Sequence, residues 1–254
     1  MRICAVLPAA GRGSRLGLEV PKLLAPIRGS ETVLTLLAHK LRQVADHVHI
    51  VVAPASRALI ERALRAIEWD AGDGGRIPST SIGVQPQPIG MGDAVFRGRR
   101  AWLRAQTLLI VWGDQIHVSE QTLRRALARH NGVPRRIVLP LVEVAEPYVA
   151  YRFDERGRLG GVLQAREGDP CPAVGCGDVG AFVVSAPGLA EAWLQYCGRQ
   201  PLGARTRELN FLPFLVYLAQ AGWEVIPVAV ADPLEARGIN TPDDLEFFQG
   251  LYRY

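Results

Sequence analysis

The sequence predicts a three-layer α/β fold around a mixed, mostly parallel β-sheet. Short apolar runs of strand length alternate along the chain with segments of helical periodicity, which is the pattern of successive βαβ units. The chain has 254 residues, enough to bury a substantial core without disulfides or structural metals. No linker, repeat or low-complexity segment interrupts it, so we expect a single domain over residues 1–254.

The first half shows the alternation most clearly. Its apolar runs are rich in Val, Ile and Leu, as expected for strands that are buried on both faces. In the segments between them, apolar residues recur every three or four positions. We expect strands at 3–7, 48–53, 81–85 and 107–112, and helices at 31–44, 57–67 and 92–104.

Beyond residue 136 the strands become more irregular, and we expect them to extend the same sheet. A hairpin is predicted over residues 150–163, turning at 154–157. The other expected elements are strands at 136–144, 179–185 and 224–230, and helices at 188–196, 210–221 and 242–251.

The basic residues are distributed in a way that favours small anionic substrates. The formal net charge of +4 is spread in short groups, without a basic tail, which is typical of solvated helix faces and speaks against nucleic acid as a partner. A mildly basic balance suits phosphate-bearing ligands. Only Lys22 and Lys40 are lysines among 29 basic residues, so a compact ammonium group is expected to matter at Lys22.

The sequence also indicates a compartment. No apolar run reaches the length of a membrane span, and the N-terminus does not have the pattern of a signal peptide. The four cysteines match neither zinc nor redox spacing. We expect a cytoplasmic protein with reduced cysteines and no membrane partner; a homo-oligomer stays open.

A glycine-rich turn follows the first strand, in segment 7–17. Its glycines allow close approach of the backbone to a ligand, and Arg12 and Arg15 add charge suited to a polyphosphate. The dinucleotide fingerprint and the P-loop both require a glycine at position 16, where Leu16 stands, so both are excluded. A plain flexible turn is the alternative.

Two segments, Leu-Pro-Ala-Ala-Gly-Arg-Gly-Ser-Arg-Leu at 7–16 and Pro-Lys-Leu-Leu at 21–24, resemble the signature of the nucleotide-sugar pyrophosphorylase family. They are most similar to the uridyltransferase domain of bacterial N-acetylglucosamine-1-phosphate uridyltransferase. The resemblance implies a Rossmann-like nucleotide-diphospho-sugar transferase fold, with a nucleotide-binding half at 1–135 and an acceptor-binding half at 136–254. It implies nucleoside contacts at Leu7, Ala9, Ala10 and Gly11, and phosphate contacts at Gly13, Arg15 and Lys22, of which Arg15 and Lys22 are catalytic.

A second similar segment covers residues 85–94. By resemblance, Gln85 and Gly90 bind the edge of a pyrimidine, which favours UTP or dTTP. Asp93 stands where the family often has histidine, so that histidine's role does not transfer to it. Asp93 is equally well explained as an N-terminal helix cap.

The third signature is an apolar strand that ends in Gly113-Asp114. Ligands of open α/β sheets gather at this edge, and Mg²⁺ bound to a triphosphate requires one or two carboxylates there. By resemblance, Asp114 holds the catalytic Mg²⁺ together with Asn240, which lies in a segment similar to the family's Glu-Val-x-Gly-Val-Asn. The alternatives are a turn or cap at Asp114 and a helix cap at Asn240. His117, a single histidine nearby, is expected to be structural.

The acceptor half departs from the family pattern at Ala150, Gln164 and Asp178, which by resemblance contact the acceptor. These changes indicate an acceptor other than N-acetylglucosamine 1-phosphate, such as another sugar phosphate or a cyclitol phosphate. The sequence thus predicts a nucleotidyltransferase that releases pyrophosphate. Two alternatives are a cytidylyltransferase or guanylyltransferase acting on another small phosphate, and a catalytically silent regulatory subunit.

Overall fold

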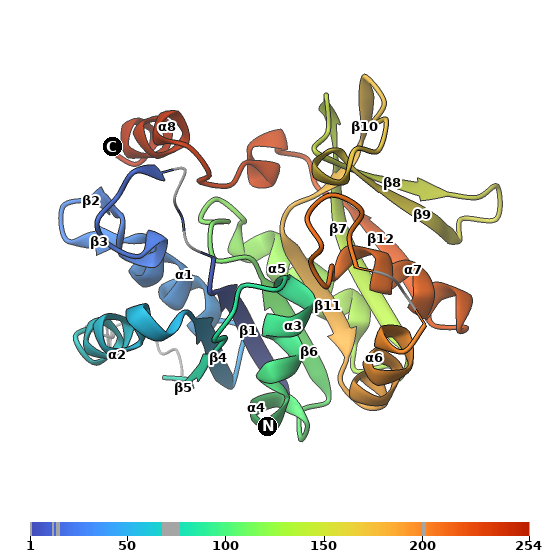
Figure 1. Ribbon diagram of the computed structural model, residues 1–254, viewed down its shortest axis with the longest axis horizontal. Helices are drawn as coiled ribbons and strands as arrows, with labels where there is room; N and C mark the ends of the chain where they lie inside the picture. Colours follow the sequence, from blue (N-terminus) through green and yellow to red (C-terminus); the bar gives the residue numbers. More distant parts are fainter. Residues whose placement is uncertain (1, 12, 14–15, 68–76, 200–201, 254) are drawn as a thin grey trace.

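The computed structural model describes residues 2–11, 13, 16–67, 77–199 and 202–253. Its main sheet has eight strands; seven follow the order β10-β7-β11-β6-β1-β4-β5, and β12, off this path, pairs in parallel with β7 (Figure 1). The strands of this sheet are β1 (Ile3–Ala9), β4 (His47–Val52), β5 (Ser79–Val84), β6 (Thr107–Val111), β7 (Arg136–Ala145), β10 (Val174–Asp178), β11 (Ala181–Ser185) and β12 (Glu224–Ala229).

Two further pairs of strands lie outside this sheet. They are β2 (Pro26–Arg28) with β3 (Glu31–Thr32), and the hairpin of β8 (Val149–Phe153) with β9 (Leu159–Gln164). The α-helices are α1 (Val33–Arg42), α2 (Arg57–Arg65), α3 (Met91–Arg97), α4 (Arg99–Trp102), α5 (Glu120–His130), α6 (Leu189–Cys197), α7 (Leu212–Gln220) and α8 (Pro242–Leu251), and the 3-10 turns are η2 (Lys22–Leu24), η3 (Pro54–Ser56), η5 (Ala165–Glu167) and η6 (Pro233–Ala236). None of the helices in the described ranges is long and apolar enough to cross a membrane.

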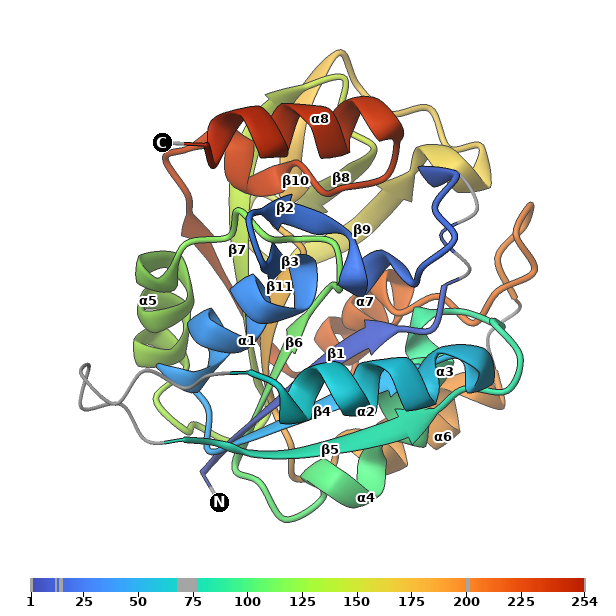
Figure 2. The same cartoon turned by 90° about the vertical axis from the view of Figure 1, so that its left-hand side faces the viewer.

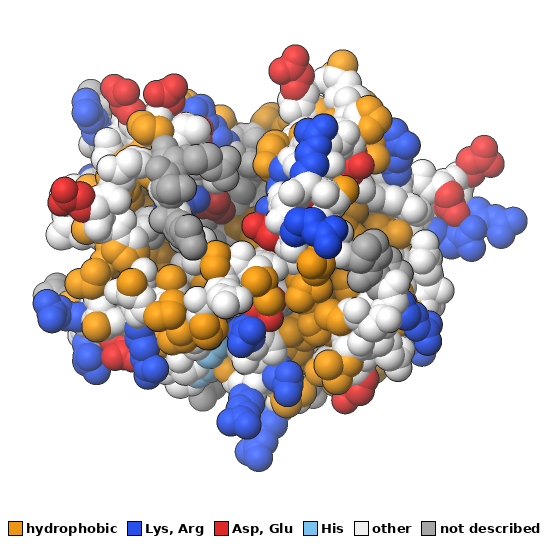
Figure 3. Space-filling model, viewed as in Figure 1, with side chains coloured by type: hydrophobic (Ala, Val, Ile, Leu, Met, Phe, Trp, Pro, Cys, Tyr) orange, Lys and Arg blue, Asp and Glu red, His pale blue; other side chains and the backbone are white. Residues whose placement is uncertain are grey.

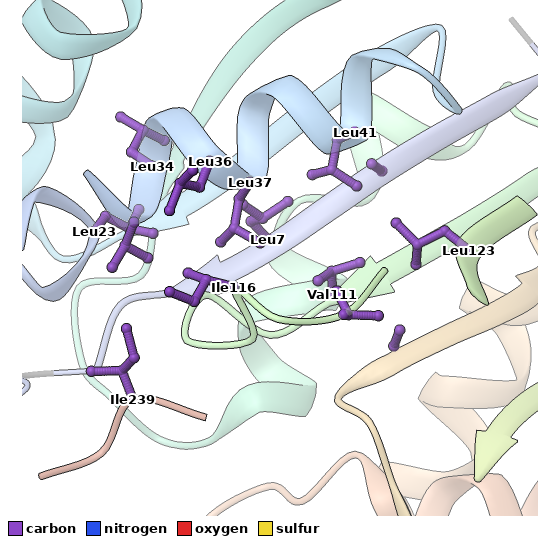
Figure 4. Packing of buried hydrophobic residues seen from close by; sticks show 14 of the residues in the cluster. Leu7, Leu23, Leu34, Leu36, Leu37, Leu41, Val111, Ile116, Leu123 and Ile239 are labelled. Atoms are coloured by element: carbon purple, nitrogen blue, oxygen red, sulfur yellow. The ribbon is translucent and has the colours of Figure 1, made fainter. Parts of the chain in front are cut away.

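The sheet lies between two helical layers, as the sequence predicts. Side chains alternate across β1: Ala5 and Leu7 face one core, and Cys4 and Val6 face the other. The first core packs against α1, α2, α5 and α8, and the second against α3, α4, α6 and α7 (Figures 1 and 2). Figure 4 shows Leu7 against the leucines of α1, and the clustered side chains of Leu23, Ile116 and Ile239 nearby.

The strand directions bring the predicted signatures together. β1, β4, β5 and β6 run parallel to one another, so the loops that follow them emerge at one edge of the sheet. β11 is antiparallel to both of its neighbours, β6 and β7, which makes the sheet mixed. β7, β10, β11 and β12 extend the same sheet, as expected for the second half, whereas the β8–β9 hairpin, which was expected to do so as well, forms a separate pair.

Two differences from the predicted helices have local causes. The helix expected over 92–104 is divided at Gly98, which ends α3 and precedes α4. A Cβ at Gly98 would lie 2.6 Å from the ring of His49, so the chain turns where only glycine fits. Helix α5, which the sequence analysis did not predict, begins at the side-chain cap of Ser119 and ends at Asn131 in the left-handed conformation.

Lys and Arg side chains form separated groups on the face seen in Figure 3, in line with the expectation of solvated helix faces there. All four cysteines are free. His117 bonds to Tyr252 and Asp232, at 3.3 and 3.4 Å, the structural role expected of it.

His49 makes stability depend on pH. Its ring is buried in β4, Nδ1 lies 2.7 Å from the hydroxyl of Ser81, and Nε2 has no hydrogen-bond partner among the described residues. Burial, with a smaller contribution from His47, lowers the pKa of His49 to about 4. The folded protein therefore keeps this ring neutral at pH values where the unfolded chain, with an ordinary histidine pKa, binds a proton.

We predict that stability falls as pH drops through the ordinary pKa of histidine toward about 4. Lowering the pH from about 7 to about 5 should reduce the free energy of unfolding by about 2 kcal/mol because of His49. Urea titrations of the wild type and of His49→Asn at both pH values measure this. The variant, although less stable at both, should lose about 2 kcal/mol less on acidification. Equal losses in the two proteins would rule out His49 as the cause.

Candidate active site

Three cavities lie in series at the carboxyl edge of the parallel strands, and Met91 lines all of them. The central cavity, of about 310 Å³, contains the glycine-rich turn. A smaller cavity of about 90 Å³ shares Pro8, Gly11 and Met91 with it. The third, of about 280 Å³, shares Met91, Trp112, Asp114 and Asn240 with it. We call them the base-side (90 Å³), central and acceptor-side (280 Å³) cavities.

The glycine-rich turn lies where the sequence predicts. Ala9, Gly11 and Gly13 line the central cavity, and Gly13 has a φ of 60°, a conformation that favours glycine. Arg15 lies outside the described residues. Leu7 is 1% exposed and its side chain packs in the hydrophobic core, so the nucleoside contact predicted for Leu7 would be made by its backbone.

Three side chains far apart in the sequence converge in the central cavity. The ammonium of Lys22 lies 3.2 Å from Oδ2 of Asp114 and donates a hydrogen bond of 3.3 Å to Oδ1 of Asn240. The Lys22 and Asp114 side chains are about one-fifth exposed, so the cluster faces the cavity without being fully buried. A cation and two oxygen ligands therefore meet at one point.

The backbone around these side chains is closely fitted. The amide of Ile239 donates to the carbonyl of Asp114 at 3.1 Å, which ties the two segments together. A Cβ on Gly238 would lie 3.2 Å from the carboxyl carbon of Asp114, so glycine permits this approach. Thr241 caps α8 in a capping box, which excludes the alternative of Asn240 as the cap. Ser119 caps α5, so Asp114 is not the cap of that helix.

A buried polar cluster holds the loop that follows Asp114. Glu235, 6% exposed, accepts hydrogen bonds from the amide of Ser119 at 3.1 Å and the hydroxyl of Thr122 at 3.0 Å. Lys40 donates to the carbonyl of Val118 at 2.9 Å, and burial lowers the pKa of Lys40 to about 8 despite the nearby charge of Glu235. The chain's second lysine thus fixes the loop that carries Asp114.

The base-side cavity is lined by Ala10, Gly11, Gln85 and Gly90, as the sequence analysis expects, and also by Glu208. The amide nitrogen of Gln85 donates to the carbonyl of Gly90 at 3.0 Å and to Oδ2 of Asp93 at 2.8 Å. Gly90 itself occupies the N-cap position of α3, which has no side-chain cap. Asp93 is therefore a partner of Gln85 and not a helix cap.

The acceptor-side cavity is lined by Gln164 and Asp178, whereas Ala150 is 2% exposed and is not among its lining residues. Strand alternation turns the side chain of Ala150 inward while Val149 and the preceding Tyr148 line the cavity, so the acceptor contact predicted for Ala150 would be made by its backbone amide. The cavity also contains residues that the sequence analysis missed, among them Gln115 and Arg166.

Asp178 has an unusual environment. Burial, with a contribution from Asp114, raises the pKa of the Asp178 carboxyl, while hydrogen bonds from Gly180 and Tyr151 act in the opposite direction. The Gly180 amide donates at 2.8 Å and the Tyr151 hydroxyl at 3.0 Å. Each carboxylate oxygen of Asp178 thus accepts one hydrogen bond, and the two bonds fix the orientation of the side chain.

This arrangement has the chemistry of nucleotidyl transfer: a glycine-rich turn and a cation beside oxygen ligands, between two cavities for two substrates. The fold and the site define a nucleotidyltransferase. The chain belongs to the MobA-like NTP transferase domain family, whose model matches residues 5–171.

Curated relatives agree with this assignment. The bifunctional protein GlmU of Pseudomonas syringae is 27% identical over 257 residues, covering 100% of this chain and 52% of the relative. That of Azotobacter vinelandii is 28% identical over 243 residues, covering 94% and 49%. The chain thus spans about half the length of the curated relatives it matches.

Two solved structures share the fold. A nucleotidyl transferase from Methanothermobacter thermautotroptrophicus has a TM-score of 0.62 and 23% identity, covering 98% of this chain and 97% of the other. A 4-diphosphocytidyl-2C-methyl-D-erythritol synthase from Anaerococcus prevotii has a TM-score of 0.65 and 14% identity, covering 98% and 95%.

Proposed function

We propose that the protein joins a nucleoside triphosphate, preferably UTP or dTTP, to a sugar 1-phosphate or a cyclitol phosphate, and releases pyrophosphate. The observation that carries this proposal is the series of three cavities. Asp114 and Asn240 line both the central and the acceptor-side cavities, so they lie where two substrates meet. The base-side cavity adjoins the central one, with which it shares Pro8, Gly11 and Met91.

The donor set fits Mg²⁺. Carboxylate and amide oxygens are the ligands that this hard cation prefers, and it is usually held by one or two carboxylates with phosphate oxygens and water. The oxygens of Asp114 and Asn240 already converge on one positive charge, the ammonium of Lys22. When bound there, Mg²⁺ would neutralise charge on the phosphates.

The protein's own groups would supply position and charge. Backbone of the glycine-rich turn would face the triphosphate, and Lys22 would stabilise the negative charge on the departing pyrophosphate. The acceptor's phosphate oxygen attacks the α-phosphorus, and the bond from that phosphorus to the pyrophosphate breaks. Because the attacking phosphate is already ionised, no protein group needs to remove a proton.

The acceptor-side cavity suits a polar ring that carries a phosphate. Gln115, Gln164 and Asp178 present hydrogen-bonding groups suited to hydroxyls. Arg166 adds a positive charge that suits the acceptor's phosphate, and it pairs with Glu208 at 3.1 Å. The volume of the acceptor-side cavity, about 280 Å³, is near the lower end for small-molecule sites.

We predict that Arg166→Ala raises the KM for the acceptor by about tenfold to a hundredfold, because a charged hydrogen bond to phosphate is lost, and leaves the KM for UTP almost unchanged. Steady-state kinetics with each substrate varied in turn measures both constants. Arg158→Ala, on the exposed turn of the β8–β9 hairpin, is the matched control and should change neither. An unchanged acceptor KM in Arg166→Ala would remove this residue from the acceptor site.

Pyrophosphate release, measured with UTP, dTTP, CTP, GTP and ATP crossed with sugar and cyclitol phosphates, tests the proposed function. We expect the highest kcat/KM with UTP or dTTP and with an acceptor other than N-acetylglucosamine 1-phosphate. A preference for CTP or GTP would favour the cytidylyltransferase or guanylyltransferase alternatives. Binding without turnover in every combination would support the silent regulatory subunit.

A further inference from the structure

Gln85 is held in one orientation by two groups that can only accept hydrogen bonds. The residue is 3% exposed and directly follows β5. Its amide nitrogen carries two protons, one donated to the Gly90 carbonyl at 3.0 Å and the other to Oδ2 of Asp93 at 2.8 Å. Neither proton remains for a ligand.

The orientation of the amide follows from chemistry. Rotating the amide by half a turn would place its oxygen against a carbonyl and a carboxylate, both of which repel it. The nitrogen must therefore face Gly90 and Asp93. The remaining hydrogen-bonding atom of Gln85, its Oε1, can accept a hydrogen bond from a ligand but cannot donate one.

Asp93 is itself fixed. Nε of Arg97, one turn further along α3, donates to the same Oδ2 at 2.6 Å, and the Asp93 side chain is 14% exposed. Gly90 is fixed as well, because a Cβ there would lie 2.5 Å from the carbonyl oxygen of Leu209, and its φ of 124° favours glycine. Gln85 thus lies between two rigid acceptors.

Nucleobases differ in what they present to such an acceptor. Uracil and thymine carry an N–H between two carbonyls, and guanine carries a ring N–H beside one, whereas cytosine and adenine present a lone pair at the equivalent ring nitrogen. Cytosine and adenine can donate to Oε1 of Gln85 only from the exocyclic amine beside that ring nitrogen, so they cannot bind in the pose in which the ring N–H of uracil donates to this oxygen. The cavity of about 90 Å³ favours a single ring over a purine.

We propose that Asp93 is a positioning residue that sets base specificity: by holding the Gln85 amide, it makes the site select uracil or thymine and reject cytosine and adenine. This inference rests on the proposed function, in which the base-side cavity receives the nucleobase.

Isothermal titration calorimetry of UTP and CTP, with Mg²⁺ and without acceptor, tests the inference independently of turnover. In Asp93→Ala only the Gly90 carbonyl still holds the Gln85 amide, so turning its nitrogen toward cytosine costs less, and the ratio of the CTP and UTP dissociation constants should fall by about tenfold. Asp93→Asn can place an oxygen at the same point, so it should keep most of the wild-type ratio. Melting temperatures confirm that both variants fold.

Glu61→Ala is the matched control, because Glu61 pairs with Arg57 on α2 with the same four-residue spacing and is not among the residues lining the three cavities. It should leave the ratio unchanged. An unchanged ratio in Asp93→Ala, or an equal loss in Asp93→Asn, would overturn the inference. A wild type that prefers CTP would overturn it too while leaving nucleotidyl transfer intact, whereas a wild type that binds no nucleotide would overturn the proposed function as well.

Discussion

The Asp114→Ala variant is expected to release pyrophosphate about a thousandfold more slowly than the wild type, with a melting temperature within a few degrees of it. Asp114 provides the only carboxylate of the cluster with Lys22 and Asn240. Without it, Mg²⁺ loses its charged protein ligand, and the positive charge of Lys22 loses its partner. Because the Asp114 side chain is partly exposed and lines two cavities, its removal leaves the core intact.

Single-turnover kinetics with saturating UTP and acceptor measures this effect apart from binding. The control is Asp243→Ala, an exposed aspartate in the first turn of α8, three residues beyond Asn240, which should retain full activity. If Asp114→Ala keeps more than about a tenth of the wild-type rate, Asp114 does not hold the catalytic metal.

The Lys22→Ala variant should lose about a hundredfold to a thousandfold in kcat, because a preorganised cation beside the phosphates is worth several kcal/mol in a partly enclosed site. Lys22 lies at the start of η2, and its neighbour Leu23 packs in the core, so the position of the ammonium is fixed by the fold. Lys22→Arg keeps the charge but replaces a compact ammonium with a planar fork, and should recover only part of the activity.

The rate as a function of added Mg²⁺ separates this prediction from a general loss of structure. Lys22→Ala should bind Mg²⁺–UTP with only modestly reduced affinity, whereas its rate at saturation stays low. Full recovery of the rate at saturating substrate would show that Lys22 contributes to binding alone, and not to the chemical step.

Periodicity was enough to predict most of the fold, because strands and helices bury their apolar residues with different spacing. It failed where tertiary contacts decide. Helix α5 was missed because its sequence is polar and only four of its positions are buried, against the rest of the fold, although its cap at Ser119 is a local signal. The break at Gly98 depends on the ring of His49, about fifty positions away. Such contacts leave no local pattern in the sequence.

The site divides in the same way. The residues of the central cavity could be predicted because glycine turns and a carboxylate after a strand are local signals, and parallel strands bring them to one edge. Arg166 and Glu208 were missed because they join the site through a long-range ion pair. Strand alternation turns the side chains of Leu7 and Ala150 into the protein, which leaves the contacts predicted for these two residues to their backbone atoms.

Transfer of a nucleotidyl group across the junction of the central and acceptor-side cavities can be observed by following each phosphate of UTP. The wild type is given UTP labelled on the α- or the γ-phosphate, Mg²⁺, and the panel of sugar and cyclitol phosphates. We predict that the α-label enters a new product with one acceptor and that the γ-label appears in an equal amount of pyrophosphate, only when that acceptor is present. Transfer of the γ-label to the acceptor, or label release that does not depend on any acceptor, would show that the protein does not transfer the nucleotidyl group of UTP.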